Sequence, residues 1–291
     1  MEMRQIECFL ACSEQRSFTA AARALNLVQS AVSTSVGKLE HELGVRLFDR
    51  TPRSLELTEA GQAMIAPARA LLRARRDIVD AVDATRGEIR GEVVVGNLMN
   101  IHNVDLAGAI ADLHRRFPGV TLQMRQSISG MAGNLAGLRD NSLELALLAG
   151  LTDEIPGITT YLITEETLVL CMSVDHPLAG KAIRAADLHG ERYIDYPPGW
   201  GIRGIAEELF PTRRPVIEVA DQTFALELAA KGFGVALVPL SVARLSPEVP
   251  RAEFTPHPLP WKLSVGHDAR RTPSHAARRV IEALTSSHEA R

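Results

Sequence analysis

Small polar side chains gather on one side of a helix that we predict from Gln29 to Leu43. The apolar residues of this stretch follow the i, i+4, i+7 spacing of a single face, which consists of Val32, Val36, Leu39 and Leu43. The opposite side carries Gln29, Ser30, Ser33, Thr34, Gly37 and Lys38. Short hydrogen-bonding side chains of this kind suit contacts with base edges in a major groove. An ordinary amphipathic helix with a solvated polar face has the same periodicity, so both interpretations stay open.

A slimmer helix is predicted just before this one. Ser17 can cap an alanine-rich helix that runs from Thr19 to Leu25. The triplet Asn26-Leu27-Val28 makes the turn to the next helix, and Gly44 is placed to end that helix. Val28 cannot cap through its side chain, which should cost about 1 kcal/mol unless the turn compensates. The two helices together have the layout of a helix-turn-helix.

Two arginines stand at the tip of a predicted hairpin that follows. Leu47 and the segment Leu55-Glu56-Leu57 are typical of short strands, and Arg50-Thr51-Pro52-Arg53-Ser54 is typical of a turn. Guanidinium groups at such a tip can reach phosphates or a narrow minor groove. The hairpin therefore favours the DNA-binding interpretation of the helix before it.

The stretch from Met3 to Gly61 resembles the winged helix-turn-helix of LysR-type transcriptional regulators. The resemblance is carried by Arg4-Gln5, Phe9, Ser17-Phe18-Thr19, Ala21-Ala22, Leu25, Gln29-Ser30-Ala31-Val32-Ser33, Leu39-Glu40, Leu43-Gly44-Val45-Arg46-Leu47-Phe48-Asp49-Arg50 and Leu57-Thr58-Glu59-Ala60-Gly61. It implies a regulator of transcription that binds double-stranded DNA. The residues expected to contact DNA are Ser17, Thr19, Gln29, Ser30, Ser33, Thr34, Lys38, Arg50 and Arg53.

The chain departs from the family pattern within the recognition helix. Val28 stands where the family usually has a serine, and Thr34 and Ser35 replace the arginine and glutamine of many members. Residues 1–60 hold seven basic and eight acidic side chains, so this region is not generally basic. Affinity for DNA must then come from individually placed charges, helix N-termini and two copies of the domain.

A long helix from Thr58 to about Thr85 follows the hairpin. Ile65, Leu72 and Val79 recur every seven residues, which predicts a helix-helix seam. By resemblance this is the dimerisation helix; packing against its own domain is the alternative. The expected domains are residues 1–60 for DNA binding, 58–90 for the linker helix and hinge, and 91–291 for effector binding.

The C-terminal part alternates strands and helices, which predicts an α/β fold with a mostly parallel sheet. It resembles the two-lobed effector domain of LysR-type regulators, which is related to type 2 periplasmic binding proteins. The first lobe is expected at about 91–160 and 266–291, and the second at about 161–265. The resemblance is carried by Phe117-Pro118-Gly119-Val120, Leu143-Glu144-Leu145-Ala146, Asp175-His176-Pro177-Leu178 and Gly232-Phe233-Gly234-Val235-Ala236-Leu237-Val238-Pro239.

A small-molecule effector is expected in the cleft between these lobes, near strand ends and helix N-termini. Arg203 and the helix N-termini favour an anionic effector, and Trp200 could cover an apolar or ring-shaped part of it. Equally, Trp200 could be a packed loop anchor and Arg203 a surface ion pair. The residues expected to contact the effector are Asn97, Asn100, Ser127, Ser129, Trp200, Arg203, Gln222 and Thr223.

Other classes of protein find little support in the sequence. We find no catalytic triad, carboxylate pair, metal-ligand cluster or phosphate loop, so we expect neither an enzyme nor a cofactor. A solute-binding protein would explain residues 91–284 but not residues 1–60. Without a membrane-spanning run or signal segment, we expect a cytoplasmic location, and we expect Cys8, Cys12 and Cys171 to be buried free thiols. The expected partners are DNA, the effector and further copies of the chain, as dimer or tetramer; the resemblance also allows RNA polymerase, and no membrane is expected.

Overall fold

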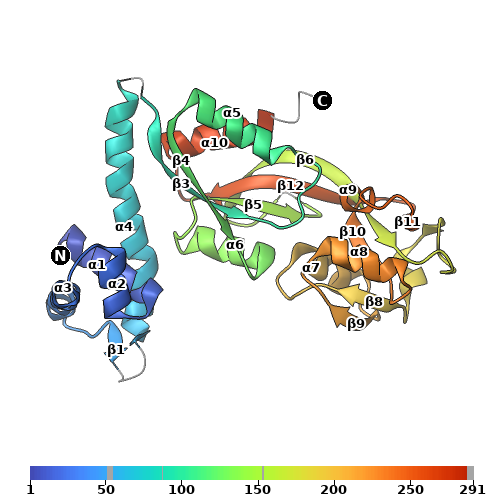
Figure 1. Ribbon diagram of the computed structural model, residues 1–291, viewed down its shortest axis with the longest axis horizontal. Helices are drawn as coiled ribbons and strands as arrows, with labels where there is room; N and C mark the ends of the chain where they lie inside the picture. Colours follow the sequence, from blue (N-terminus) through green and yellow to red (C-terminus); the bar gives the residue numbers. More distant parts are fainter. Residues whose placement is uncertain (51–54, 87, 153, 287–291) are drawn as a thin grey trace. The chain divides into compact units, whose positions relative to one another are not determined.

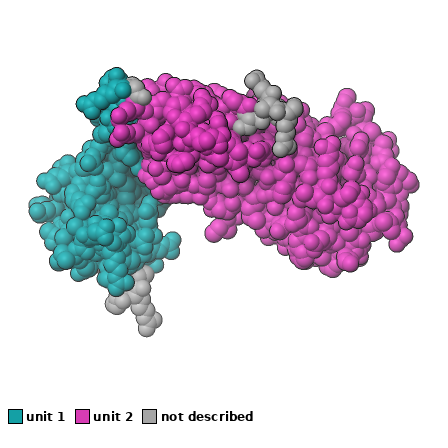
Figure 2. Space-filling view, turned by 45° about the horizontal axis from the view of Figure 1, so that its top comes forward, with its two compact units in different colours: residues 1–86, 139–142 teal, residues 87–138, 143–291 magenta. Residues whose placement is uncertain are grey.

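The computed structural model describes residues 1–50, 55–86, 88–152 and 154–286, which form two compact units (Figure 1). The N-terminal unit comprises Met1–Arg86 and Arg139–Ser142, and the C-terminal unit comprises Gly87–Leu138 and Leu143–Arg291. Figure 2 shows the two units in different colours. The long linker helix therefore belongs to the same compact unit as the helix-turn-helix.

The N-terminal unit has a small apolar core enclosed by helices and a two-stranded hairpin. Val32, Val36 and Leu39 are completely buried against Ile6 and Phe9 of the first helix. Val32, Val36 and Leu39 therefore form the apolar face that their spacing predicted. The elements are α1 Met3–Gln15, α2 Phe18–Ala24, α3 Gln29–Leu43, β1 Phe48–Arg50, β2 Leu55–Leu57 and α4 Glu59–Ala84.

Helix α4 begins where the sequence predicts. The Thr58 hydroxyl accepts a hydrogen bond from the N–H of Gly61 at 3.0 Å, which caps the helix. Pro67 lies inside α4 without ending it. Ile65 and Ala68 are buried in the core of the N-terminal unit, whereas Val79 is exposed farther along. The first part of α4 is therefore packed on its own domain and the later part is not.

The first lobe of the C-terminal unit is built around β3, which has parallel β4 and β5 as neighbours. Successive side chains of β3 point to opposite faces, so Val93 and Val95 pack with α5 and α10 while Val94 packs with α6. Figure 1 shows α5 and α10 together over one face of this sheet. The elements are β3 Arg90–Asn97, α5 Leu106–Arg116, β4 Gly119–Gln126, α6 Gly130–Arg139, β5 Leu145–Gly150 and α10 His275–Ser286.

The second lobe has its own core, which includes Tyr193, Tyr196 and Phe210. Tyr196 donates its hydroxyl to the carbonyl oxygen of Leu237 at 3.0 Å, so this buried polar group is satisfied. Its burial raises the pKa of the phenol well above the ordinary value. The elements are β7 Ala182–Ile183, the 3-10 turn η1 Ala185–Leu188, β8 Arg192–Asp195, α7 Gly201–Leu209, β9 Arg214–Glu218, α8 Gln222–Ala230, β10 Ala236–Pro239, α9 Leu240–Ala243 and β11 Arg251–Phe254.

Two long antiparallel strands, β6 (Ile158–Cys171) and β12 (Leu259–Asp268), run through both lobes. They join the lobes into one sheet with the order β4-β3-β5-β12-β6-β11-β7, and β10 also pairs with β6. The expectation of a mostly parallel sheet is therefore wrong. The reason is that β12 returns directly from the second lobe and inserts antiparallel between β5 and β6. Trp261 on β12 packs against the cores of both lobes.

Candidate functional site

The polar side of α3 is exposed, as DNA binding requires. Gln29, Ser30, Thr34 and Lys38 are exposed, and Ser33 is half-buried. The helix starts without a side-chain cap at Val28 and ends at Gly44, whose φ of 69° is left-handed. One part of the predicted apolar face is wrong: Leu43 is 44% exposed, because it is the last helical residue before the chain turns at Gly44.

Hydrogen bonds of the neighbouring segments hold α3 in place. The Ser17 hydroxyl accepts the N–H of Ala20 at 3.3 Å, so its oxygen caps α2, and Thr19 is exposed beside it. A Glu40 carboxylate oxygen accepts the N–H groups of Leu47 and Phe48 at 2.9 and 3.3 Å, which ties α3 to the hairpin. In the hairpin, Arg50 pairs with Leu55 along the strands. Arg53 at the predicted wing tip lies outside the described residues.

Two adjoining hollows lie between the lobes of the C-terminal unit, with volumes of about 40 and 30 Å³. That is room for a few water molecules. Trp200, Gln222 and Asn100, which were expected at the effector site, line these hollows. The other lining residues are Leu98, Met99, Ile101, Asn103, Gln126, Gly130, Met131, Ala149, Glu166, Gly201, Ile202, Trp261 and Leu263.

Several buried polar atoms of the hollows have no hydrogen-bond partner among the described residues. They are Nε1 of Trp200, Oε1 of Gln222, and Nδ2 of Asn100 and Asn103. Gln222 is only 4% exposed. Because buried polar groups are nearly always paired in folded proteins, these four atoms call for partners that the described residues do not supply.

The two lobes touch through glycines beside these hollows. The N–H of Ala132, in the first turn of α6, donates to the carbonyl oxygen of Gly199 at 3.0 Å. A Cβ on Gly199 would stand 2.9 Å from the backbone oxygen of Ser129, and a Cβ on Gly130 would stand 2.9 Å from the Trp200 ring. Only residues without side chains allow so close an approach.

The remaining expected effector contacts line neither hollow. The backbone oxygen of Asn97 accepts a hydrogen bond from Asn134 at 3.2 Å. The backbone oxygens of Ser127 and Ser129 accept N–H groups in the first turn of α6, each at 3.4 Å. Thr223 is half-buried and donates its hydroxyl to Asp221, the exposed N-cap of α8.

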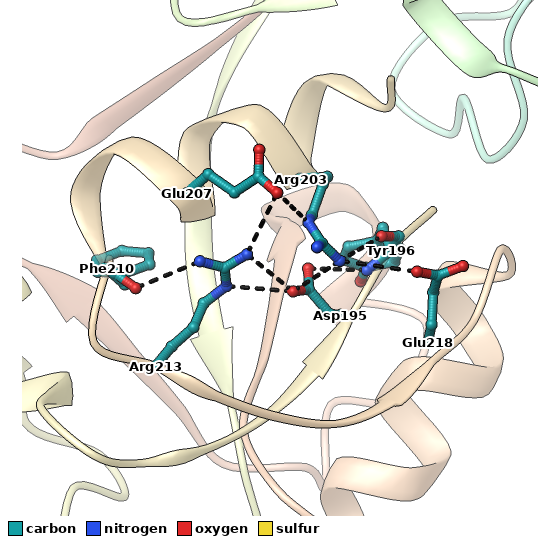
Figure 3. Close-up of polar contacts among 7 residues, drawn as sticks. All are labelled: Asp195, Tyr196, Arg203, Glu207, Phe210, Arg213 and Glu218. Atoms are coloured by element: carbon teal, nitrogen blue, oxygen red, sulfur yellow. Dashed lines mark hydrogen bonds and ion pairs between the residues drawn. The ribbon is translucent and has the colours of Figure 1, made fainter. Parts of the chain in front are cut away.

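Arg203 belongs to a network of ion pairs in the second lobe (Figure 3). Its guanidinium lies 2.9 Å from the buried carboxylate of Asp195 and 2.6 Å from Glu207. It also donates to the carbonyl oxygen of Tyr196 at 3.0 Å. The hydrogen bond to Glu207 is the main cause that raises the pKa of Arg203. Arg203 therefore forms ion pairs, as the alternative interpretation expected. One of its carboxylate partners, Asp195, is buried, whereas the others lie at the surface.

The same network contains a second, more buried arginine that the sequence did not indicate. Arg213 approaches the same Asp195 oxygen at 2.9 Å, and its side chain is only 7% exposed. Asp195 is completely buried between the two guanidinium groups. This pairing fixes the end of β8 to α7, and so it holds the loop that carries Trp200.

Trp261, Met99, Gln126 and Glu166 line the hollows and were missed by sequence reasoning. Trp261 and Glu166 lie on β12 and β6, the long strands that run through both lobes. The alternation of strands and helices in the sequence does not show that these strands pass a cleft. Glu166 accepts the backbone N–H and the hydroxyl of Ser241 at 2.6 and 2.9 Å. Burial raises the pKa of its carboxyl group. The available signal was a pair of neighbouring glutamates, Glu165 and Glu166, within a strand.

Thiol chemistry is not supported at any of the three cysteines. Cys8, Cys12 and Cys171 are free and buried, as expected. Burial raises the pKa of Cys171 to about 12, so its reactive thiolate form is scarce at neutral pH. Among the described residues no group of three metal-ligating side chains comes together. Nor does any described helix have the length and hydropathy needed to cross a membrane.

Comparisons with known proteins agree with both halves of the chain. Residues 3–62 match the family model of the bacterial regulatory helix-turn-helix protein, lysR family, and residues 86–289 match that of the LysR substrate binding domain. The chain is 33% identical over 288 residues to the HTH-type transcriptional regulator ShiR of Corynebacterium glutamicum. The match covers 93% of this chain and 96% of ShiR.

Solved structures of full-length regulators share the fold. A full-length OxyR variant from Pseudomonas aeruginosa has a TM-score of 0.77 at 24% identity. The match covers 100% of this chain and 95% of the OxyR chain. CbnR, described as a LysR family transcriptional regulator, has a TM-score of 0.64 at 25% identity with 99% of both chains covered. It has also been solved in complex with its target DNA. The chain thus belongs to the LysR family of DNA-binding transcriptional regulators, with an N-terminal helix-turn-helix and a two-lobed effector-binding domain.

Proposed function

We propose that α3 reads base edges in the major groove of its operator through its exposed polar face. The observation that carries this proposal is the division of α3 into an apolar side, where Val32, Val36 and Leu39 are completely buried, and a largely exposed side of small polar residues. Further contacts to phosphates come from the N-terminus of α2 and from the hairpin. The proposed DNA contacts are Ser17, Thr19, Gln29, Ser30, Ser33, Thr34, Lys38, Arg50 and Arg53.

Replacing Gln29 with glutamate tests this assignment. Gln29 is exposed at the first position of α3, where a negative charge stabilises a helix. The variant should therefore keep its thermal stability, while repulsion from phosphates and the lost amide should weaken operator binding at least about tenfold. The measurement is a mobility-shift titration on the DNA upstream of the protein's own gene.

Gln15→Glu is the matched control, because it makes the same change at an exposed residue of the same unit, at the end of α1. It should leave DNA affinity within about twofold of the wild type, since it is not on the polar face of α3. Equal losses in both variants would contradict the proposed interface. Failure of the wild type to bind duplex DNA at low salt would contradict the proposed function itself.

Members of this family bind DNA and form oligomers, and we propose that the later part of α4 joins two copies of this chain. The predicted seam of Ile65, Leu72 and Val79 divides in the structure: Ile65 is buried in its own domain, and Val79 is 56% exposed. Ile78 and Val82 are exposed beside Val79. Three apolar side chains in water on one helix favour a helix of a second copy as their partner.

Val79→Asp should weaken self-association at least about tenfold, because it places a charge in an apolar seam. The measurement is the mass of the protein over a dilution series by light scattering. Val174→Asp is the control, since Val174 is also well exposed but lies in the C-terminal unit. If the Val79 variant self-associates as the wild type does, the proposed seam on the later part of α4 is wrong.

For the cleft, we propose that a small molecule between the lobes alters their contact and so the spacing of the DNA-binding units. The support is the group of unpartnered polar atoms beside the glycine contact of the lobes. Altered spacing would change DNA bending and the access of RNA polymerase. An anionic effector stays a prediction, but Arg203, which motivated it, is bound to carboxylates of its own lobe.

A further inference from the structure

We propose that the cleft selects a small, planar, uncharged ligand whose edge carries a carbonyl oxygen next to an N–H group. This class includes carboxamides, lactams and similar ring compounds. The inference rests on the proposed role of the cleft as the effector site. It concerns the chemistry of the ligand, which neither the family nor the relatives fix.

The hydrogen-bonding groups of the hollows match such an edge. Trp200 offers an indole N–H, which can only donate, so the ligand must bring an acceptor. Gln222 offers a carbonyl oxygen that lacks a donor, so the ligand must bring an N–H as well. Asn100 adds a further unpartnered amide N–H in the adjoining hollow. A carbonyl beside an N–H satisfies both kinds of group at once.

The charges around the hollows argue against an anion. Among the described residues that line them, none is a lysine or an arginine, and the ionisable one is the carboxyl group of Glu166. The N-terminus of α8 is already capped by the carboxylate of Asp221, which accepts the N–H of Thr223 at 2.7 Å. The α6 N-terminus gives one of its N–H groups to Gly199. Arg244 and His102 act on Glu166 from outside the lining, so an anion in the hollows would have no cation among the described residues that line them, and its burial is costly.

The shape of the hollows favours a flat ligand. Both tryptophans of the chain, Trp200 and Trp261, form walls together with Met99 and Met131. The indole of Trp200 is itself held in place by stacking on Tyr196, at 6.3 Å between ring centroids and 11° between planes. The volumes of about 40 and 30 Å³ hold only a few water molecules, and the indole N–H of Trp200 is covered beside Gly130, so the lobes must separate before a ring-sized ligand reaches it. Binding and lobe movement are thereby linked.

The test compares neutral and anionic probes of the same shape. Benzamide and nicotinamide are titrated against benzoate and nicotinate, up to about 10 mM, on the full-length protein. Binding is followed by ligand-observed NMR and by the fluorescence of the two tryptophans. We expect at least one amide to bind about tenfold more tightly than its carboxylate. Carboxylates that bind as tightly as the amides, or amides that do not bind at all, would overturn the proposal.

Two aromatic variants provide a matched pair. Trp200→Phe keeps a ring but removes the unpartnered N–H, and should weaken amide binding about tenfold. Tyr161→Phe also removes one hydrogen-bonding group from an aromatic ring of the same unit, but Tyr161 is 38% exposed and lines neither hollow, so this variant should change affinity by no more than about twofold. Equal effects in the two variants would contradict the hydrogen bond to Trp200.

Gln222→Met, which keeps length and removes the amide, should weaken binding to a similar extent as Trp200→Phe. Circular dichroism and operator binding of each variant, measured without probe, show that it is folded. The wild-type mobility shift separates the two proposals. If operator DNA is bound but no amide is, the ligand class is wrong and the DNA-binding function stands; if operator DNA is not bound, the proposed function fails.

Discussion

Asp195→Asn is expected to lower the free energy of unfolding of the C-terminal unit by about 3 kcal/mol. The carboxylate is completely buried, and it lies 2.9 Å from both Arg203 and Arg213. Without its charge, the guanidinium of Arg213 would stay buried with weaker partners: Glu207 at 3.7 Å, the carbonyl oxygen of Phe210 at 3.4 Å and the ring of Tyr193. A buried charge without its partner is among the largest destabilising effects of a single substitution.

Glu218→Gln is the control for this prediction. It makes the same acid-to-amide change at another partner of Arg203, but Glu218 is 51% exposed and 3.7 Å away, so the effect should stay below about 1 kcal/mol. Urea unfolding followed by tryptophan fluorescence reports on the C-terminal unit alone, because Trp200 and Trp261 both lie in it. Equal stability losses in the two variants would mean that burial of Asp195 does not govern the network.

Gly199→Ala is expected to separate the two lobes at the cleft. The residue has a φ of 88°, which side chains rarely adopt, and its new Cβ would stand 2.9 Å from the Ser129 oxygen and 3.0 Å from Cβ of Ala132. Backbone strain and overlap together should disfavour the closed contact by about 1–3 kcal/mol, or roughly 5- to 150-fold in population. Loss of that contact should expose Trp200 and shift its emission to longer wavelength.

Gly180→Ala separates strain from overlap. Gly180 also has a left-handed φ, of 68°, but a Cβ there meets nothing within 4 Å. It should therefore lose some stability while its tryptophan emission stays at the wild-type wavelength. If Gly199→Ala leaves both the emission and the response of operator binding unchanged, the glycine contact does not control the lobes.

Much of the N-terminal unit could be predicted from the sequence because its signals are local. Ser17 and Thr58 cap the helices that they were expected to cap, and Gly44 ends α3. Caps and a 3.6-residue period act within a few residues, so they can be read without knowing the fold. The last turn of α3 is the exception, since the exposure of Leu43 depends on where the chain goes after Gly44.

The candidate effector site could be predicted only in part, because its walls come from distant segments. Trp200, Gln222 and Asn100 were expected from strand ends and helix starts, and they do line the hollows. Trp261 could not be placed there, since β12 meets the first lobe only after the chain has passed through the second. Sequence spacing does not show between which strands the returning segment is inserted.

By itself the sequence determined the helix-turn-helix, the exposed polar side of α3 and the α/β character of the C-terminal part, because hydrophobic period and caps are properties of neighbouring residues. Only the tertiary structure decided which partner each polar group finds. In the folded chain the guanidinium of Arg203 pairs with Asp195, whereas Oε1 of Gln222 and Nε1 of Trp200 have no hydrogen-bond partner among the described residues. The physical reason is that pairing depends on distance in space, which folding sets between residues far apart in the chain.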